Sequence, residues 1–406
     1  MKEWKTYKLS EIADIQTGPF GSQLHNNDYV DKGTPIVTVE HLGNRKFSTQ
    51  NLPCVSDEDK ARLAKYVLEK GDIVFSRVGS VDRCSYVSSD EDGWMFSGRC
   101  LRVRCNNMCN PLFLYYYFCK ETIKQYIRSV AVGATMPSIN TKLLSDLPII
   151  LPSRKIQDKV AHILARLDDK IELNRQINDN LEQQAQALYK SWFIDFEPFK
   201  NGDFVESELG LIPIGWKVTE LSAVTKQITG KVKDRTDVKV LSPVNSGELV
   251  LSEEYFTKQV FSESISKYIV VKPLHFAYNP ARVNIGSIGM NTFAFDGCVS
   301  PVYVVFECEK EYHHFFDYYR KTDSFKDEVL TRAIGGVRQT LSYKDFSLIK
   351  LVYPPLDVVK EFNAIYERLL DNINRTKSEN SKLSDIRDTL LPKLMSGELK
   401  INEIDC

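Results

Sequence analysis

"SRKIQDKVAHILARLDDKIELNRQINDNLEQQAQALYKSWF" runs from Ser153 to Phe193 and contains neither glycine nor proline. Apolar residues recur along it with the seven-residue spacing of a long amphipathic helix. The same spacing returns in "LDVVKEFNAIYERLLDNINRTKSENSKLSDIRDTLLPKLMSGEL", from Leu356 to Leu399. The sequence therefore predicts two long helices with matching apolar seams.

Each seam position of the first helix has its counterpart 202 residues later, and both seams become polar at the same two steps. The first seam is Val160, Leu164, Leu167, Ile171, Asn174, Asn178, Leu181, Ala185 and Leu188, and the second is Phe362, Tyr366, Leu369, Ile373, Thr376, Asn380, Leu383, Arg387 and Leu390. Apolar seams of this length need a surface to pack on. Either each helix docks on its own domain, or the two helices pack on each other in antiparallel fashion, with the polar steps setting the register.

A repeated segment precedes each helix. "EWKTYKLSEIADIQTG" (Glu3–Gly18) matches "GWKVTELSAVTKQITG" (Gly215–Gly230), and "AVGATMPSINTKLLSDLPIILP" (Ala131–Pro152) matches "AIGGVRQTLSYKDFSLIKLVYP" (Ala333–Pro354). Short strand-like runs bounded by turn residues lie between these ends, together with an aromatic stretch that is typical of a helix. Each copy is thus a domain of about 150 residues, in the usual size range for one domain.

We therefore expect an α+β fold with two repeated globular domains joined by two long antiparallel coiled-coil-like helices. The first domain covers residues 1–153 and the central spacer helix covers 154–200. The second domain covers 201–355 and the C-terminal spacer helix covers 356–406.

Composition indicates a globular protein of the cytoplasm. The chain has 406 residues, of which 43% are hydrophobic, and it contains no apolar run long enough to span a membrane. Met1 leads directly into a folded pattern, so we expect no secretory signal. The nine cysteines form no CxxC pair, which favours a reducing compartment, and the irregular group Cys100, Cys105 and Cys109 is a poor zinc site. We expect neither a metal nor another cofactor.

Catalytic motifs are also missing from the sequence. "YNPAR" at Tyr278 lacks the second proline and the aromatic residue of an adenine methyltransferase motif. "TGKV" at Thr229 lacks the first glycine and the final hydroxyl of a phosphate-binding loop. "DDK" at Asp168 lies on a predicted amphipathic helix, and the histidine pair at His313 adjoins an aromatic helix. We therefore expect a chain that is not an enzyme.

The order domain–helix–domain–helix resembles the specificity subunit of a Type I restriction-modification system. The resemblance covers essentially the whole chain and is carried by "ESELGLIPIGWKVTEL" (Glu206–Leu221), "GPFGSQL" (Gly18–Leu24) and "IRDTLLPKLMSGEL" (Ile386–Leu399), together with the first long helix. It implies two target-recognition domains, each reading one half of a split double-stranded DNA sequence. It also implies two modification subunits that methylate adenine and restriction subunits that translocate and cut DNA. The loop "GATMPSIN" follows the Gly–Thr–Pro pattern of the family, whereas "GGVRQTLS" in the second copy departs from it.

The net charge of the chain is −1, so DNA binding would depend on local groups of positive charge. Neither long helix carries a basic stripe. The plausible groups lie in the turn-rich segments of the two domains. Arginine suits guanine edges, amide side chains suit adenine, and lysine pairs with phosphates. The candidate DNA-binding residues are Ser22, Gln23, Arg45, Lys46, Arg77, Arg83 and Thr135 in the first domain, and Lys231, Lys233, Arg235, Arg282, Arg338 and Gln339 in the second.

The long helices also carry apolar residues outside the mutual seam. Two helices alone would leave these residues in water, so we expect helical segments of two modification subunits to complete a bundle around them. The candidate partner-binding residues are Ile163, Leu173, Ile177, Ile365, Leu370 and Ile386.

Two alternatives use the same architecture without that complex. One is a non-catalytic helical scaffold that does not touch DNA. The other is a DNA-binding regulator, although no helix-turn-helix with a basic recognition helix stands out in the sequence.

Overall fold

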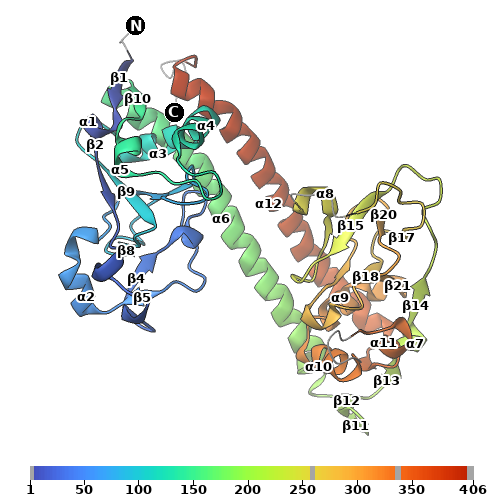
Figure 1. Ribbon diagram of the computed structural model, residues 1–406. Coiled ribbons are helices and arrows are strands. Elements are labelled where there is room, and N and C mark those ends of the chain that lie inside the picture. The colour runs from blue at the N-terminus through green and yellow to red at the C-terminus, as the bar shows by residue number, and fades with distance from the viewer. Residues whose placement is uncertain (1–3, 257–260, 334–339, 400–406) are drawn as a thin grey trace. The chain divides into compact units, whose positions relative to one another are not determined.

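The computed structural model describes residues 4–256, 261–333 and 340–399 (Figure 1). The chain divides into two compact units. Unit 1 comprises residues 1–175 and 376–406, and unit 2 comprises residues 176–375. No helix in the described ranges is long and apolar enough to cross a membrane.

The predicted repeat is confirmed element by element. The 212-residue offset places β1 (Lys5–Lys8), α1 (Leu9–Ile12) and β2 (Ala13–Thr17) over β13 (Lys217–Glu220), α7 (Leu221–Val224) and β14 (Thr225–Ile228). The 202-residue offset places β10 (Pro148–Leu151) over β22 (Lys350–Tyr353). Strand β1 pairs antiparallel with β10, and β13 pairs with β22 in the same way.

Each unit contains two four-stranded sheets. The first sheet of unit 1 has the order β2-β9-β6-β7, and its counterpart in unit 2 has the order β14-β21-β18-β19. All pairs in both sheets are antiparallel. The new strands are β9 (Cys100–Cys105), β6 (Ile73–Ser76), β7 (Cys84–Tyr86), β21 (Val304–Cys308), β18 (Phe276–Tyr278) and β19 (Ile288–Met290).

The second sheet of each unit contains one parallel pair. Its order is β3-β5-β4-β8 in unit 1 and β16-β15-β20-β17 in unit 2, and the parallel pairs are β4–β8 and β15–β20. These strands are β3 (Tyr29–Val30), β4 (Thr34–Val37), β5 (Cys54–Val55), β8 (Met95–Phe96), β15 (Lys239–Pro243), β16 (Leu249–Leu251), β17 (Ile269–Val271) and β20 (Gly297–Val299). A separate hairpin in unit 2 joins β11 (Phe204–Ser207) to β12 (Gly210–Pro213).

Short helices complete both copies. They are α2 (Asp57–Arg62), α3 (Pro111–Cys119), α4 (Glu121–Val130) and α5 (Thr141–Ser145) in the first copy, and α8 (Ser252–Tyr255), α9 (His313–Tyr319), α10 (Asp323–Arg332) and α11 (Tyr343–Phe346) in the second. Helix α3 begins at Pro111, where a missing N–H costs nothing, and the Asn110 side chain accepts from the N–H groups of Leu112 and Phe113.

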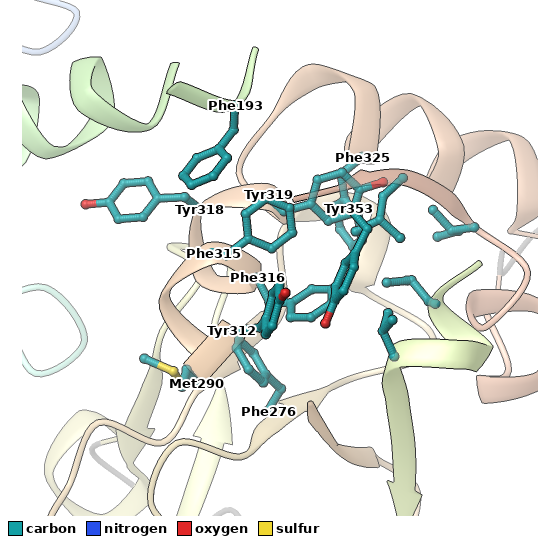
Figure 2. Packing of buried hydrophobic residues seen from close by; sticks show 14 of the residues in the cluster. Phe193, Phe276, Met290, Tyr312, Phe315, Phe316, Tyr318, Tyr319, Phe325 and Tyr353 are labelled. Carbon is teal, nitrogen blue, oxygen red and sulfur yellow. The ribbon is translucent and has the colours of Figure 1, made fainter. Parts of the chain in front are cut away.

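Aromatic side chains make the core of each unit. In unit 1, six consecutive residues of α3 from Phe113 to Phe118 are buried in the core that also holds β9 and the start of α6. In unit 2, Phe315 and Tyr319 of α9 stack in parallel with ring centroids 6.3 Å apart (Figure 2). Tyr312 and Tyr353 stack at 4.4 Å in the same core. Burial of such large rings supplies much of the stabilisation of a domain.

The long helices are α6 (Arg154–Phe193) and α12 (Leu356–Ser396), and both pass from one unit into the other. The structure buries or half-buries every residue of the predicted seams. In unit 1 the start of α6 shares a core with the end of α12, and in unit 2 Phe193 at the end of α6 packs on Phe362 near the start of α12. The helices therefore run antiparallel and pack on each other, and both are also docked on the domain cores.

Candidate nucleic-acid interface

Four turns of unit 1 lie together although they are far apart in the sequence. They are residues 18–21, 77–83, 97–99 and 131–138, and we call them the turn cluster. The Arg77 N–H donates to the Arg99 carbonyl at 2.8 Å, and the Arg77 carbonyl accepts from the Ile139 N–H at 2.9 Å. The Gly79 N–H donates to the Pro137 carbonyl at 2.8 Å. The main chain thus joins the "SRVGS" turn to both the "SGR" turn and the "GATMPS" loop.

Two glycines allow the first turn to approach the third. A Cβ atom built on Gly18 would lie 2.2 Å from the Ser97 carbonyl oxygen, and one built on Gly98 would lie 2.4 Å from that of Pro19. Both distances are far inside van der Waals contact, so any side chain at either position would push the two turns apart. Gly18, the first glycine of the "GPFGSQL" motif, is therefore required by packing.

The turn cluster carries positive charge that no carboxylate of the described residues pairs with. Among the described residues, Arg77, Arg83 and Arg99 make no ion pair, and Arg83 and Arg99 are exposed. The guanidinium group of Arg77 donates to the Gly98 carbonyl at 3.2 Å and lies over the Phe20 ring. The structure thus brings the two predicted arginines together with Arg99, which the sequence analysis missed. Arg99 could have been found by analogy with Arg77. Arg77 comes directly after strand β6, and the "SGR" turn that contains Arg99 comes directly after strand β8.

The remaining candidates of the first copy lie in or beside this cluster. Thr135 is exposed in the loop that the Val132–Ser138 bridge closes, where Gly133 adopts a φ of 111°. Ser22 and Gln23 lie in the short 3-10 turn Gly21–Gln23 that follows Phe20. Gln23 Oε1 accepts a hydrogen bond from the Tyr66 hydroxyl at 2.7 Å, which leaves its amide nitrogen for a ligand. DNA contact by these three residues stays a prediction.

Arg45 and Lys46 have acidic partners within unit 1. Arg45 Nη1 lies 2.8 Å from Asp169 Oδ1, and Lys46 Nζ lies 3.0 Å from Glu172 Oε1. Both carboxylates belong to α6, more than 120 residues further along the chain. These cations tie the first domain copy to α6 in unit 1, and a cation that is already paired has less charge to offer a phosphate. DNA contact by Arg45 and Lys46 stays a prediction.

In unit 2, Lys231, Lys233 and Arg282 are exposed and make no ion pair with any residue that the structure describes. Lys233 adopts a left-handed φ of 56°, which marks a tight turn. Arg282 borders a cavity of about 340 Å³ whose lining also includes Asn245, Asn279 and Tyr303. Amide, hydroxyl and guanidinium groups therefore share one depression on the second domain copy.

Arg235 is paired within its own unit, as Arg45 is. Its guanidinium group lies 2.6 Å from Asp237 Oδ2 and 2.8 Å from Asp296 Oδ2. DNA contact by Arg235 stays a prediction. Arg338 and Gln339 lie outside the described residues.

Two of the six candidate partner-binding residues are half-buried, and binding by all six stays a prediction. Ile163 packs against the core of unit 1, and Leu370 packs against the core of unit 2. Their apolar side chains already have a partner within the chain. The other four remain exposed: Leu173, Ile177, Ile365 and Ile386 have exposed fractions of 51%, 38%, 42% and 47%.

Residues that could imitate a catalytic site have structural contacts. Asp168 of the "DDK" triplet accepts from the Tyr116 hydroxyl at 2.7 Å and pairs with Arg387 at 2.8 Å. His314 is buried against the Tyr366 ring, and burial, together with the neighbouring His313, lowers its pKa to about 3. The described residues contain no group of three His, Cys, Asp or Glu side chains that could hold a metal ion.

These features define a class of protein: two copies of one domain, each displaying unpaired cations on turns and each followed by a long helix. Comparison with known proteins supports one family within that class. Residues 1–183 match the family model of the Type I restriction modification DNA specificity domain. The MjaIX Type I restriction enzyme specificity subunit of Methanocaldococcus jannaschii is 24% identical, with 99% of this chain and 95% of the relative covered. The HindI Type I restriction enzyme specificity subunit of Haemophilus influenzae is also 24% identical, with 98% and 100% covered.

A solved structure agrees with the fold along the full length. The Type I restriction-modification system S subunit from M. genitalium superposes with a TM-score of 0.60 at 16% identity, covering 97% of this chain and 96% of that one. The chain is therefore similar in sequence to Type I restriction enzyme specificity subunits along nearly its full length, and it shares its fold with one solved S subunit.

Proposed function

We propose that this chain is the sequence-reading subunit of a Type I restriction-modification complex in the cytoplasm. Each domain copy binds one half of a split double-stranded DNA target through its turns. The chain carries out no chemistry itself. Two modification subunits, each a methyltransferase, methylate adenine at the chosen site, and restriction subunits translocate and cut DNA that lacks the modification.

One observation supports this proposal: the protein holds two copies of one domain, and both copies present cations that make no ion pair with any described residue. In the first copy these are Arg77, Arg83 and Arg99, and in the second they are Lys231, Lys233 and Arg282. Arginine in a turn can reach the O6 and N7 acceptors of guanine, and lysine can pair with phosphates. Because the loops of the two copies differ in sequence, the two half-sites differ too, and the target is asymmetric.

The neutral balance of charge fits a subunit that binds DNA within a complex. A chain of net charge −1 has weak general attraction for DNA, so sequence-independent affinity must come largely from other subunits. The exposed apolar residues Leu173 and Ile386 in unit 1, and Ile177 and Ile365 in unit 2, are proposed contacts for helices of the modification subunits.

Long-read sequencing of genomic DNA tests the proposal, because it detects methyladenine in its sequence context. Cells that carry the gene should show one asymmetric, interrupted motif, and deletion of this gene alone should abolish methylation at that motif. A scaffold that does not read DNA would leave no motif dependent on the gene. A regulator would bind a sequence in a gel-shift assay without any methylation at it.

A further inference from the structure

Phe20 places an aromatic ring in solvent within the turn cluster. Its exposed fraction is 60%, which is unusual for a phenylalanine, since most such rings are buried. Burial of this ring against a ligand would remove a large apolar area from water. Single exposed apolar residues are common on proteins, so the exposure becomes informative only through what surrounds it.

The ring is held in place rather than free to collapse onto the domain. The Phe20 backbone is extended, with φ −145° and ψ 166°, and a Cβ built on Gly98 would lie 2.7 Å from the Cβ of Phe20. The guanidinium carbon of Arg77 lies 5.7 Å from the ring centroid, within the range of a cation–π contact. Arg77 is in turn anchored by its hydrogen bond to the Gly98 carbonyl. One turn therefore presents an apolar ring and a cation side by side.

The surrounding charge selects DNA as the occupant of this surface. Arg77, Arg83 and Arg99 lie on turns of the same cluster and have no carboxylate partner among the described residues. A polyanion that also offers apolar groups satisfies both parts of the surface. In the major groove of DNA, the apolar group is the C5 methyl of thymine, and guanine offers the acceptors that suit arginine.

We propose that Phe20 is a specificity-determining residue whose ring contacts the methyl group of a thymine in the half-site read by the first domain copy. Arg77 contacts an adjacent base pair, because the guanidinium group and the ring are held together. This inference rests on the proposed function and adds to it a predicted feature of recognition: one thymine of the first half-site is read through its methyl group.

The test uses the complete methyltransferase complex and duplexes that contain the methylated motif. Uracil replaces thymine at one position of the half-site at a time, which removes only the methyl group. We expect one such replacement to weaken binding by the wild-type complex about fourfold, as the burial of a single methyl group implies. The Phe20→Ala complex should bind the thymine and uracil duplexes equally, whereas Phe20→Leu should keep part of the preference.

Outcomes separate this inference from the proposed function. Equal binding of thymine and uracil duplexes at every position by the wild-type complex overturns the role of Phe20, while specific binding still supports the proposed function. Absence of any sequence preference overturns both. Thermal denaturation of the free chain verifies that Phe20→Ala is folded, which its exposed position predicts. If Phe20→Ala binds both duplexes more weakly but still prefers thymine over uracil as the wild type does, the ring does not read the methyl group. It then acts by insertion between bases, and the inference is wrong.

Discussion

Asn174 of α6 donates a hydrogen bond from Nδ2 to Oδ1 of Asn380 in α12 at a distance of 2.9 Å. Asn380 Nδ2 donates back to the Ile171 carbonyl at 3.1 Å. Asn174 is completely buried at a polar step of the seam in unit 1, and its Nδ2 also donates to Glu379 Oε2 at 2.8 Å. Among the described residues its Oδ1 has no hydrogen-bond partner. The donor side of Asn174 is therefore satisfied in this register of the two helices and would lose both acceptors in a shifted one.

Replacing one member of the pair should destabilise the protein. Asn174→Leu leaves Asn380 Oδ1 without its donor and should cost about 1–3 kcal/mol of unfolding free energy in unit 1. Urea denaturation followed by circular dichroism measures the change. Asn180→Leu, on the exposed side of α6, is the matched control and should be nearly neutral. The double variant Asn174→Leu/Asn380→Leu should recover most of the loss. A single variant as stable as the wild type would contradict this role.

Stability should fall between pH 6.5 and pH 5 because of His314. Burial keeps this imidazole neutral in the folded state, with a pKa of about 3, whereas the unfolded chain takes up a proton near pH 6.5. The unfolded state therefore binds more protons in this interval, and stability decreases as the pH falls, by about 1.4 kcal/mol per pH unit below pH 6.5. The stability is fully present above that pH.

The control for this pH dependence is the neighbouring histidine. His314→Phe should flatten the dependence of the urea midpoint on pH between 7 and 5, whereas His313→Gln should retain it. His313 is half-buried and its ring nitrogen Nδ1 lies 2.6 Å from the Lys310 carbonyl. An unchanged slope in His314→Phe would show that another group titrates.

Arg99→Ala should weaken DNA binding by the methyltransferase complex without altering the fold. Loss of a guanine contact would cost about 1–3 kcal/mol of binding free energy and relax the base preference at one position. Loss of a phosphate contact would instead reduce the slope of the logarithm of the binding constant against the logarithm of salt concentration by about 1. Fluorescence anisotropy over a range of salt concentrations distinguishes the two. Arg128→Ala is the matched control, since Arg128 is exposed but already paired with Asp82 and Glu121. Equal effects of both substitutions would refute the assignment.

The exposed apolar residues of the long helices should be needed for assembly. Ile386→Asp in unit 1 should reduce co-purification of the modification subunits about tenfold or more, because a carboxylate buried in an apolar interface is costly. Thr389→Asp, one turn away and also exposed, should have little effect. Ile163→Asp should instead lower the thermal stability of the free chain, because Ile163 packs on its core. Full co-purification with Ile386→Asp would exclude this surface as the docking site.

The sequence predicted what depends on local periodicity and repetition. The seam of α6 and α12 follows from side-chain spacing along single helices, so Leu164 and Ile171 were placed in it correctly. The repeat offset likewise predicted matched strands, since two similar segments fold alike. Predictions of contact between distant segments were less successful. The pairing of Arg45 with Asp169 joins residues 124 positions apart, and no local pattern indicates it.

In the candidate DNA interface too, residues with a local sequence signal were predicted and residues defined by distant contacts were missed. Arg77 was found because it lies in a turn after a strand-like run. Arg99 was missed because its importance comes from the hydrogen bond between its carbonyl and the Arg77 N–H, which only the folded chain creates. Ile163 and Ile386 are both isoleucines outside the predicted seam, so the sequence does not distinguish them. Ile163 nevertheless packs on the core of unit 1, whereas Ile386 is 47% exposed. Their surroundings come from the other helix and from the domain.

If each domain copy reads its own half of one split DNA target, a single domain should be exchangeable. Residues 1–153 are replaced by the corresponding segment of a relative with a different known target, and methyladenine is mapped by long-read sequencing before and after. We expect a new interrupted motif in which one half has changed to that of the relative and the other half is retained. A motif that changes in both halves, or in neither, while the complex still methylates DNA would show that the domain copies do not read separate halves.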